Sequence, residues 1–304
     1  MDSESKQING DDLSDLPDIK SFIDALADVR RSLSPFASVA EIAQTFYDRA
    51  IMHTQLYGFS NPPNFTSQTF YRARLNIDLA NEDIGLIKTY SYPPSSACKV
   101  NGRANLKGRS VFYCSDHALT AIYECKPKVG DYGFLSIWDN HKADRIVKFA
   151  ICLPKDLRPD NNWTRDAVKA HLYAEEYSRV RGGIKSAQLN ALNEYISRQF
   201  IEEKEPYLLT SMLAENYLYY KSKADFIVYP SIVANSQHCN LAFHPNSVET
   251  LLSFKKVIRF RVTDVVDSPR GLNLAIGKTG ELNGACLEWR KTSEHEVPFL
   301  GTIR

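Results

Sequence analysis

The segment NGRANLKGRSVFYCSDHALTAIYEC, residues 101–125, divides into three successive pieces around which the rest of the chain can be arranged. It begins with a loop that carries two glycines and two arginines: Gly102, Arg103, Gly108 and Arg109. An apolar run from Val111 to Cys114 follows and predicts a buried strand. Ser115 and Asp116 have side chains that cap helix N-termini, so they predict a helix that continues to about Cys125.

This predicted strand–turn–helix unit can bring three chemically useful side chains to one cleft. The apolar residues of the helix recur at helical spacing and are expected to face the core: Ala118, Ala121, Ile122 and Cys125. Glu124 lies on another stripe, Tyr113 lies in the strand, and Arg103 belongs to the loop. On spacing alone, the favoured interpretation is a solvated glutamate, a core tyrosine and a surface arginine, because charged residues on a polar helix face usually contact only water.

The pattern G-R-x-N-x-x-G, then V-F-Y, then S-D-x-A-L-T-A-I-Y-E resembles the RES domain family. Upstream, the sequence FYRAR at residues 70–74 is similar to the first strand of that family. Downstream, DFIVYPS at residues 225–231, followed by NLAF at residues 240–243, resembles the strand that carries the family's serine. These four pieces stand in the family's order between about Thr69 and Val262, which is roughly two-thirds of the chain.

The resemblance implies a fold, an activity and a set of site residues. The implied fold class is α+β, with a mixed sheet similar to that of ADP-ribosyltransferases, flanking helices and a helical N-terminal appendage. The implied activity is degradation of NAD by a toxin that is paired with a protein antitoxin. The family's arginine, glutamate and serine correspond to Arg72, Glu124 and Ser231, with Arg103 and Tyr113 as further pocket residues.

The chain departs from the family pattern near both arginines, and a long charged segment before Ser231 makes it larger than the smallest members. Some members have a tyrosine directly after the first arginine, where this chain has Ala73. The aromatic residue and prolines that often follow the second arginine are replaced by Ala104, Leu106 and Lys107. If the missing tyrosine holds the nicotinamide ring, another aromatic residue must replace it, and the candidates are Tyr71, Tyr90 and Tyr92.

Alternation along the strand from Thr69 to Leu75 places Arg72 and Arg74 on the same face, opposite Tyr71. Two guanidinium groups that face the same way suit a diphosphate, since each can bind phosphate oxygens through two parallel hydrogen bonds. Without the family resemblance, an edge strand with solvated arginines is the favoured interpretation.

Composition excludes several classes of protein. The chain has 304 residues, 43% of them hydrophobic, which excludes global disorder. Its net charge of +1 argues against general binding of nucleic acid or membrane surfaces, and no apolar run is long enough to span a membrane. The polar, acidic N-terminus is not expected to act as a signal peptide, and six scattered cysteines without a C-x-x-C pair predict a reducing cytoplasm. The spacing of His238, Cys239 and His244 matches no established zinc pattern, so no metal is expected.

The predicted domain organisation has four parts. Residues 1–16 are expected to be a disordered tail, residues 17–60 a helical appendage, residues 61–265 the catalytic domain, and residues 266–304 a C-terminal extension of that domain. Two helices are predicted in the appendage, from Asp18 to Leu33 and from Ser38 to about Tyr57, and the breaker GFSNPPN at residues 58–64 marks the boundary. Further strands are predicted at residues 133–138, 145–153, 225–229, 239–243 and 255–262, with helices between residues 163 and 221.

If NAD is the substrate, cleavage of its nicotinamide–ribose bond passes through a cationic ribose centre, which needs a nearby carboxylate, clamps for the diphosphate and an aromatic surface. Glu124 would stabilise the cation and Ser231 would orient the substrate by hydrogen bonding. NAD is then a substrate and no cofactor is needed; inorganic phosphate is a possible co-substrate, bound by Arg74 or Arg109. Water, phosphate or a protein side chain can accept the ADP-ribosyl group, and the sequence leaves these open. The alternative function is a non-enzymatic interaction protein on the same fold.

Overall fold

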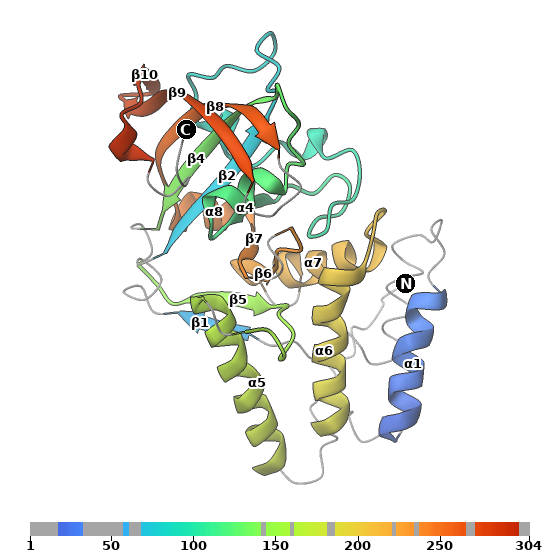
Figure 1. Ribbon diagram of the computed structural model, residues 1–304. Helices are drawn as coiled ribbons and strands as arrows, with labels where there is room; N and C mark the ends of the chain where they lie inside the picture. Colours follow the sequence, from blue (N-terminus) through green and yellow to red (C-terminus); the bar gives the residue numbers. More distant parts are fainter. Residues whose placement is uncertain are drawn as a thin grey trace, which may run out of the picture.

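The computed structural model describes residues 18–32, 57–60, 68–140, 144–158, 161–180, 186–220, 223–233, 237–265 and 271–297. Its described strands form one sheet in the order β1-β5-β6-β7-β3-β2-β4-β8-β9-β10 (Figure 1). The strands are β1 (Tyr57–Ser60), β2 (Thr69–Leu75), β3 (Phe112–Ser115), β4 (Tyr132–Asp139), β5 (Val147–Ile151), β6 (Phe226–Pro230), β7 (Cys239–Phe243), β8 (Ser253–Val265), β9 (Leu272–Asn283) and β10 (Cys286–Lys291). Strands β5 and β6 are parallel and the other neighbours are antiparallel, so the sheet is mixed and the predicted α+β class is confirmed.

Among the described helices, α1 precedes the first strand in the sequence and the others lie between successive strands. They are α1 (Ile19–Ser32), α4 (Ala118–Tyr123), α5 (Asn162–Val180), α6 (Ser186–Glu202), α7 (Leu208–Tyr219) and α8 (Pro245–Leu251). Helix α6 lies between α1 and α5 in the lower part of the molecule, and α4 lies against β2 (Figure 1). Phe22 and Leu26 of α1 are buried in the same core cluster as α6 and α7, so the N-terminal helix packs on the main body.

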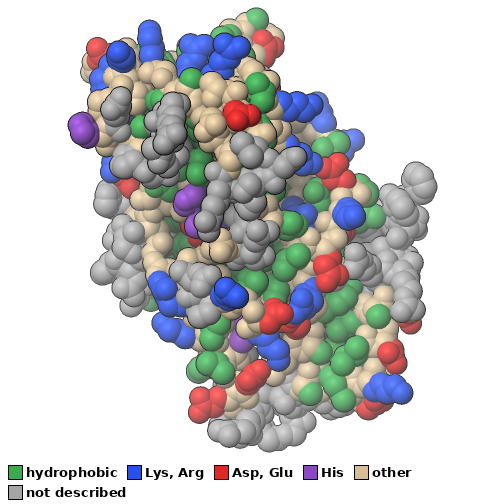
Figure 2. Space-filling view, in the orientation of Figure 1, with side chains coloured by type: hydrophobic (Ala, Val, Ile, Leu, Met, Phe, Trp, Pro, Cys, Tyr) green, Lys and Arg blue, Asp and Glu red, His purple; other side chains and the backbone are tan. Residues whose placement is uncertain are grey.

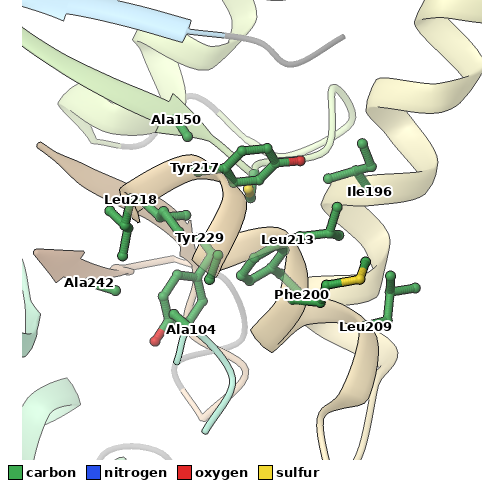
Figure 3. Close-up of a cluster of buried hydrophobic side chains, with 14 of the residues drawn as sticks. Ala104, Ala150, Ile196, Phe200, Leu209, Leu213, Tyr217, Leu218, Tyr229 and Ala242 are labelled. Carbon is green, nitrogen blue, oxygen red and sulfur yellow. The ribbon is translucent and has the colours of Figure 1, made fainter. Parts of the chain in front are cut away.

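Three hydrophobic clusters hold the helices to the sheet. Figure 3 shows the first, in which Leu213 and Leu218 of α7 pack with Ile196 and Phe200 of α6 near Tyr229 of β6. A second, aromatic cluster contains Phe70, Phe112, Trp138, Phe149, Trp163, Phe226 and Phe243. The third buries α4 against β2, β4 and β8, and it contains Ala118, Ala121 and Ile122, as the helical spacing predicted. Burial of this apolar surface positions α4 and therefore the residues that follow it.

Most predicted elements are present, and three differ from expectation. The residue that caps α4 is His117, whose side chain accepts no hydrogen bond from a helix N–H, whereas Asp116 accepts a hydrogen bond of 3.0 Å from the N–H of Cys239. Strand β1 pairs with β5, so residues 57–60, which the sequence assigned to the appendage and its boundary, belong to the main sheet. Strands β9 and β10 extend the sheet in a region for which the sequence predicted no strands. The predicted helix from Ser38 to Tyr57 lies mostly outside the described residues.

The sheet changes its pairing next to the family's first arginine. Strand β2 pairs with β4 along its whole length, from Thr69 to Leu75. On its other side β2 pairs with β3 only between Tyr71 and Ser115. The two strands therefore diverge beyond this pair, and the backbone leaves room for a cavity within the sheet.

Three further findings concern the chemistry of the chain. All six cysteines are free thiols. In the part of the chain that the structure describes, no helix combines the length and the apolar character that a membrane crossing requires. On the face seen in Figure 2, basic and acidic side chains are interspersed, as expected for a net charge near zero.

Candidate active site

A cavity of about 320 Å³ lies where β2 and β3 diverge. Its walls come from β2, β3, α4, the ends of β6 and β7, and the connection between α6 and α7. The described residues that line it are Tyr71, Arg72, Ala73, Arg103, Tyr113, Cys114, Ala121, Glu124, Cys125, Lys126, Glu205, Tyr207, Tyr229, Pro230, Ile232 and Asn240.

The carboxylate of Glu124 is held in this cavity by two hydrogen bonds to one of its oxygens. Ser231 Oγ donates to Glu124 Oε1 at 2.6 Å, and Asn240 Nδ2 donates to the same oxygen at 2.6 Å. Both donors are buried, whereas the glutamate side chain is exposed. Among the described residues Oε2 accepts no hydrogen bond, so one carboxylate oxygen is oriented by the protein and the other is available to a bound molecule.

The fold brings these three residues together from distant parts of the chain. Glu124 follows α4, Ser231 follows β6, and Asn240 lies in β7, which pairs with β6. The N–H of Ser231 donates to the carbonyl of His238 at 2.9 Å, which fixes the start of the chain segment after β6. The sequence prediction did not assign a role to Asn240. The signal for it is a polar side chain in the apolar run of Cys239–Phe243.

Arg72 is a half-buried cation with unused hydrogen-bonding capacity. Its Nη1 donates to the carbonyl of Tyr113 at 2.9 Å, across the gap between β2 and β3, and its guanidinium lies 5.4 Å from the centre of the Phe112 ring. Its Nε is buried and has no partner among the described residues. Burial, with a smaller effect of Arg74, lowers the pKa of Arg72 to about 10, so the group remains charged at neutral pH. A buried donor without a partner is costly, and an anionic ligand would satisfy it.

Arg103 is held by two contacts with the helical part of the molecule. Its Nη1 donates to the carbonyl of Phe200 at 2.8 Å, near the end of α6. Its guanidinium lies 4.7 Å from the centre of the Tyr207 ring, a cation–π contact. Tyr207 precedes α7 and has φ 51°, a left-handed conformation that is uncommon for a residue other than glycine. The sequence prediction did not include Tyr207, which lies in the long segment before Ser231.

The ring of Tyr113 lines the cavity, and its hydroxyl forms hydrogen bonds with the preceding loop. The hydroxyl donates to Asn105 Oδ1 at 2.8 Å and accepts a hydrogen bond of 2.7 Å from the N–H of Ala104. Burial raises the pKa of Tyr113 above its usual range. At Gly102 an added Cβ would lie 2.4 Å from Asn105 Oδ1 and 2.8 Å from the tyrosine hydroxyl, so this position requires glycine. Hydrogen bonds of the Tyr113 hydroxyl therefore hold strand β3 against the loop that contains Gly102 and Asn105.

Arg74 does not share the cavity with Arg72, contrary to the expectation from strand alternation. It forms a bidentate pair with Glu82, with Nη1 2.5 Å from Oε2 and Nη2 2.9 Å from Oε1, and it also donates to the carbonyl of Thr89. Arg109, the other expected phosphate ligand, pairs with Glu215 at 2.8 Å. Both arginines therefore stabilise the surrounding structure, and neither lines the cavity.

Among the aromatic residues considered as replacements for the missing tyrosine, only Tyr71 lines the cavity. The Tyr90 hydroxyl donates to the carbonyl of Ile84 inside a hydrophobic cluster, and the Tyr92 hydroxyl donates to Glu249 at 3.0 Å. Tyr207 and Tyr229 supply further aromatic surface. Of the residues that the sequence singled out, the cavity thus brings together Tyr71, Arg72, Arg103, Tyr113 and Glu124, with Ser231 bound to the glutamate.

The model of the RES domain family matches residues 71–262, well over half of the chain. The chain belongs to the RES domain family. This family is associated with enzymes that act on NAD. No curated protein and no solved structure showed a significant similarity to the chain. The matched range of this RES protein contains every residue described above for the cavity.

The site of this RES protein combines a carboxylate with two guanidinium groups in one cavity. It can therefore bind a molecule that has an anionic part and a part that becomes cationic during reaction. In the described ranges, no group of three or more His, Cys, Asp or Glu side chains is arranged to hold a metal ion.

Proposed function

We propose that this RES protein degrades NAD by cleaving the bond between nicotinamide and ribose. The observation that carries this proposal is the carboxylate of Glu124, fixed by Ser231 and Asn240 in the same cavity as Arg72 and Arg103. A carboxylate with one oriented oxygen and one available oxygen suits a developing positive charge. Two cations in the same cavity suit the diphosphate of a dinucleotide.

Glu124 acts on the ribose in this proposal. The nicotinamide of NAD is cationic and leaves as a neutral ring, so positive charge moves onto the ribose as the bond breaks. Glu124 Oε2 would lie next to this charge, and the hydrogen bonds from Ser231 and Asn240 would keep the carboxylate in place before the reaction begins. Preorganised charge of this kind contributes on the order of 3 kcal/mol or more to catalysis.

The remaining lining residues bind the two ends of the substrate. Arg72 has an unpartnered buried Nε and Arg103 keeps N–H groups beyond the one bound to Phe200, so both can donate to phosphate oxygens. The rings of Tyr71, Tyr113 and Tyr207 offer apolar faces for the nicotinamide and adenine rings. These contacts support binding of a dinucleotide.

The acceptor of the ADP-ribosyl group is identified by the products. Purified protein is incubated with NAD, with and without inorganic phosphate, and the products are separated and identified by mass spectrometry. Free ADP-ribose indicates water as acceptor, its phosphorylated form indicates phosphate, and modified protein indicates a side chain. A folded Glu124→Gln protein is the matched control, and we expect it to lose activity by about a hundredfold, the effect of removing one charge contact. NAD consumption that is absent in the wild type, or unchanged in Glu124→Gln, would refute the proposal.

We also propose that the protein is a toxin controlled by a separate protein. An enzyme that consumes NAD harms the cell that makes it, so the cavity must be blocked until it is needed. Because Arg72 and Arg103 line the cavity, an acidic segment or a C-terminal carboxylate of the partner is the complementary group. A partner of this kind is an antitoxin.

A further inference from the structure

Lys126, at the rim of the cavity, has a backbone conformation that favours a different residue. It follows α4 with φ 53°, and its N–H donates to the carbonyl of Tyr123 at 2.9 Å. Lys126 comes two residues after Glu124, the C-cap of α4, and a left-handed residue at the end of a helix is most often glycine, because a Cβ crowds the backbone there. Glycine would therefore fit this backbone conformation better than lysine does. Strain of this kind is a reason to look for a function.

The same backbone feature recurs at the cavity. In the described part of the chain four residues other than glycine have positive φ: Asn76, Lys126, Tyr207 and Lys223. Two of them, Lys126 and Tyr207, line the cavity, one after α4 and the other before α7. Residues held in uncommon conformations collect at ligand sites because the side chain is worth more there than the strain costs.

Lys126 and Glu205 form a weak ion pair between two walls of the cavity. Lys126 Nζ lies 3.9 Å from Glu205 Oε1, and the side chains are 84% and 72% exposed. Both residues line the cavity, Lys126 from the end of α4 and Glu205 from the connection between α6 and α7. An exposed pair at this distance contributes little to stability, so a more highly charged anion can displace the glutamate.

Without Lys126, the positive charge of the cavity is too small to balance a diphosphate. Among the described lining residues the cations are Arg72, Arg103 and Lys126, and the anions are Glu124 and Glu205. A diphosphate ester carries a negative charge on each phosphate, and Glu124 offsets one of the two arginine charges. Arg72 and Arg103 each already donate one N–H to a backbone carbonyl, whereas the contact of the Lys126 ammonium among the described residues is the long one to Glu205.

We propose that Lys126 is a substrate-positioning residue, which leaves Glu205 and binds the diphosphate when a dinucleotide enters the cavity. Glu205 is then a competing anion that holds the lysine at the rim of the empty site. This inference rests on the proposed NAD-degrading function and assigns it a third cation, supplied by a residue after α4.

The test uses two lysines in the same backbone conformation. Lys126→Gly removes the ammonium and relieves the left-handed strain, and Lys223→Gly makes the same change at φ 45° outside the cavity. We expect neither variant to lose thermal stability. Lys126→Gly raises KM for NAD by about tenfold, the effect of one charge-assisted hydrogen bond, with kcat within about twofold of wild type. Equal KM values in the two variants overturn the proposal.

The exchange with Glu205 is tested by a double-mutant cycle. Glu205→Gln frees the lysine and therefore lowers KM for NAD in the wild-type background. In the Lys126→Gly background the same substitution has no lysine to free, so KM stays unchanged. A decrease of KM that is equal in both backgrounds shows that Glu205 repels the substrate directly, and it overturns the exchange.

Binding of ADP-ribose separates this inference from the proposed function. Its affinity is measured by calorimetry for wild type, Lys126→Gly and Lys223→Gly. If wild type leaves NAD uncleaved but only Lys126→Gly weakens ADP-ribose binding, the enzymatic proposal fails and the role of Lys126 stands. If NAD is cleaved and both glycine variants bind ADP-ribose as wild type does, the role of Lys126 fails alone. Failure to cleave NAD together with failure to bind ADP-ribose overturns both.

Discussion

Ser231 Oγ donates a hydrogen bond of 2.6 Å to Glu124 Oε1, although 107 positions of the chain separate the two residues. Asn240 reaches the same oxygen at the same distance. Residues from the end of α4, from the end of β6 and from β7 therefore meet at one carboxylate oxygen of Glu124. Because both donors bind one oxygen, the carboxylate is fixed in orientation and its other oxygen remains available to a ligand.

Loss of either donor is expected to reduce turnover. In Ser231→Ala and in Asn240→Ala the carboxylate keeps only one hydrogen bond, so its orientation is less well held. We expect kcat for NAD to fall by about tenfold or more in each variant, as hydrogen bonds to charged groups are worth about 1.5–3 kcal/mol. Ser231→Thr retains the hydroxyl and should keep most of the activity. Wild-type kcat in both alanine variants would show that Glu124 needs no such support.

The two arginines of β2 should respond differently to the same substitution. Arg72→Lys removes the planar fork from the cavity, and we expect KM for NAD to rise by about tenfold. Arg74→Lys removes the bidentate pair with Glu82 outside the cavity, so it should lower the midpoint of thermal unfolding and leave KM near wild type. Steady-state kinetics and thermal unfolding of both variants provide the check. A rise of KM in Arg74→Lys equal to that in Arg72→Lys would contradict this assignment.

Asp116 is expected to make stability depend on pH. Its carboxylate is nearly buried, with His238 at 3.8 Å and no arginine or lysine paired with it among the described residues, and burial raises its pKa from 3.8 to about 7. Between about pH 4 and pH 7 this carboxyl group is protonated in the folded protein and ionised in the unfolded chain. The free energy of unfolding therefore falls as pH rises through this window. Asp116→Asn removes this loss and should raise the free energy of unfolding at pH 8 by up to about 4 kcal/mol, at about 1.36 kcal/mol per unit of pKa.

Urea unfolding of wild type and Asp116→Asn at pH 4.5 and at pH 8 measures this difference, and a difference that is the same at both pH values would refute it. The facing histidines must be considered in the comparison. His117 and His238 stack with ring centres 4.0 Å apart, and burial lowers the pKa of both. Their contribution runs in the opposite direction, since stability falls when they become charged at low pH. It is common to wild type and variant, so the difference between the two isolates Asp116.

Glu203 is expected to stabilise the start of α7. Its carboxylate accepts hydrogen bonds from the N–H groups of Leu209 and Thr210, both at 2.8 Å, and from the Thr210 hydroxyl at 2.6 Å. A carboxylate at a helix N-terminus satisfies unpaired donors and the helix dipole, so Glu203→Ala should cost about 1–2 kcal/mol of stability. Thr210→Val removes only one of the three hydrogen bonds and should cost less. Chemical denaturation of both variants gives the comparison, and a larger loss in Thr210→Val would contradict the capping role.

Expression in a bacterial host tests the toxin proposal. We expect wild-type protein produced alone to stop growth while cellular NAD falls, because consumption of NAD without regeneration starves the cell. Glu124→Gln should leave growth and NAD unchanged at the same level of expression. Normal growth with unchanged NAD in cells that contain folded wild-type protein would make the alternative of a non-enzymatic interaction protein the better one.

The sequence by itself determined the local elements and the family. Alternating and helical apolar patterns located β2, β3, α4, β6 and β7, since burial of one face leaves a periodic signature in the chain. The family pattern selected Arg72, Glu124 and Ser231 as a set, because those residues stand next to recognisable strands and turns.

Only the tertiary structure decided which side chains meet. Arg72 and Arg74 share the face of one strand in sequence, yet Arg72 enters the gap between β2 and β3 while Glu82, from the following loop, holds Arg74 elsewhere. Lys126 and Tyr207 line the cavity without a sequence pattern that marks them, and Asn240 lies in a recognised strand but was assigned no role there. They meet in the gap where β2 and β3 diverge: Asn240 comes from β7, Lys126 from the residues after α4, and Tyr207 from the connection between α6 and α7. These are long-range contacts, which leave no periodic signal because the partners lie far apart in the chain.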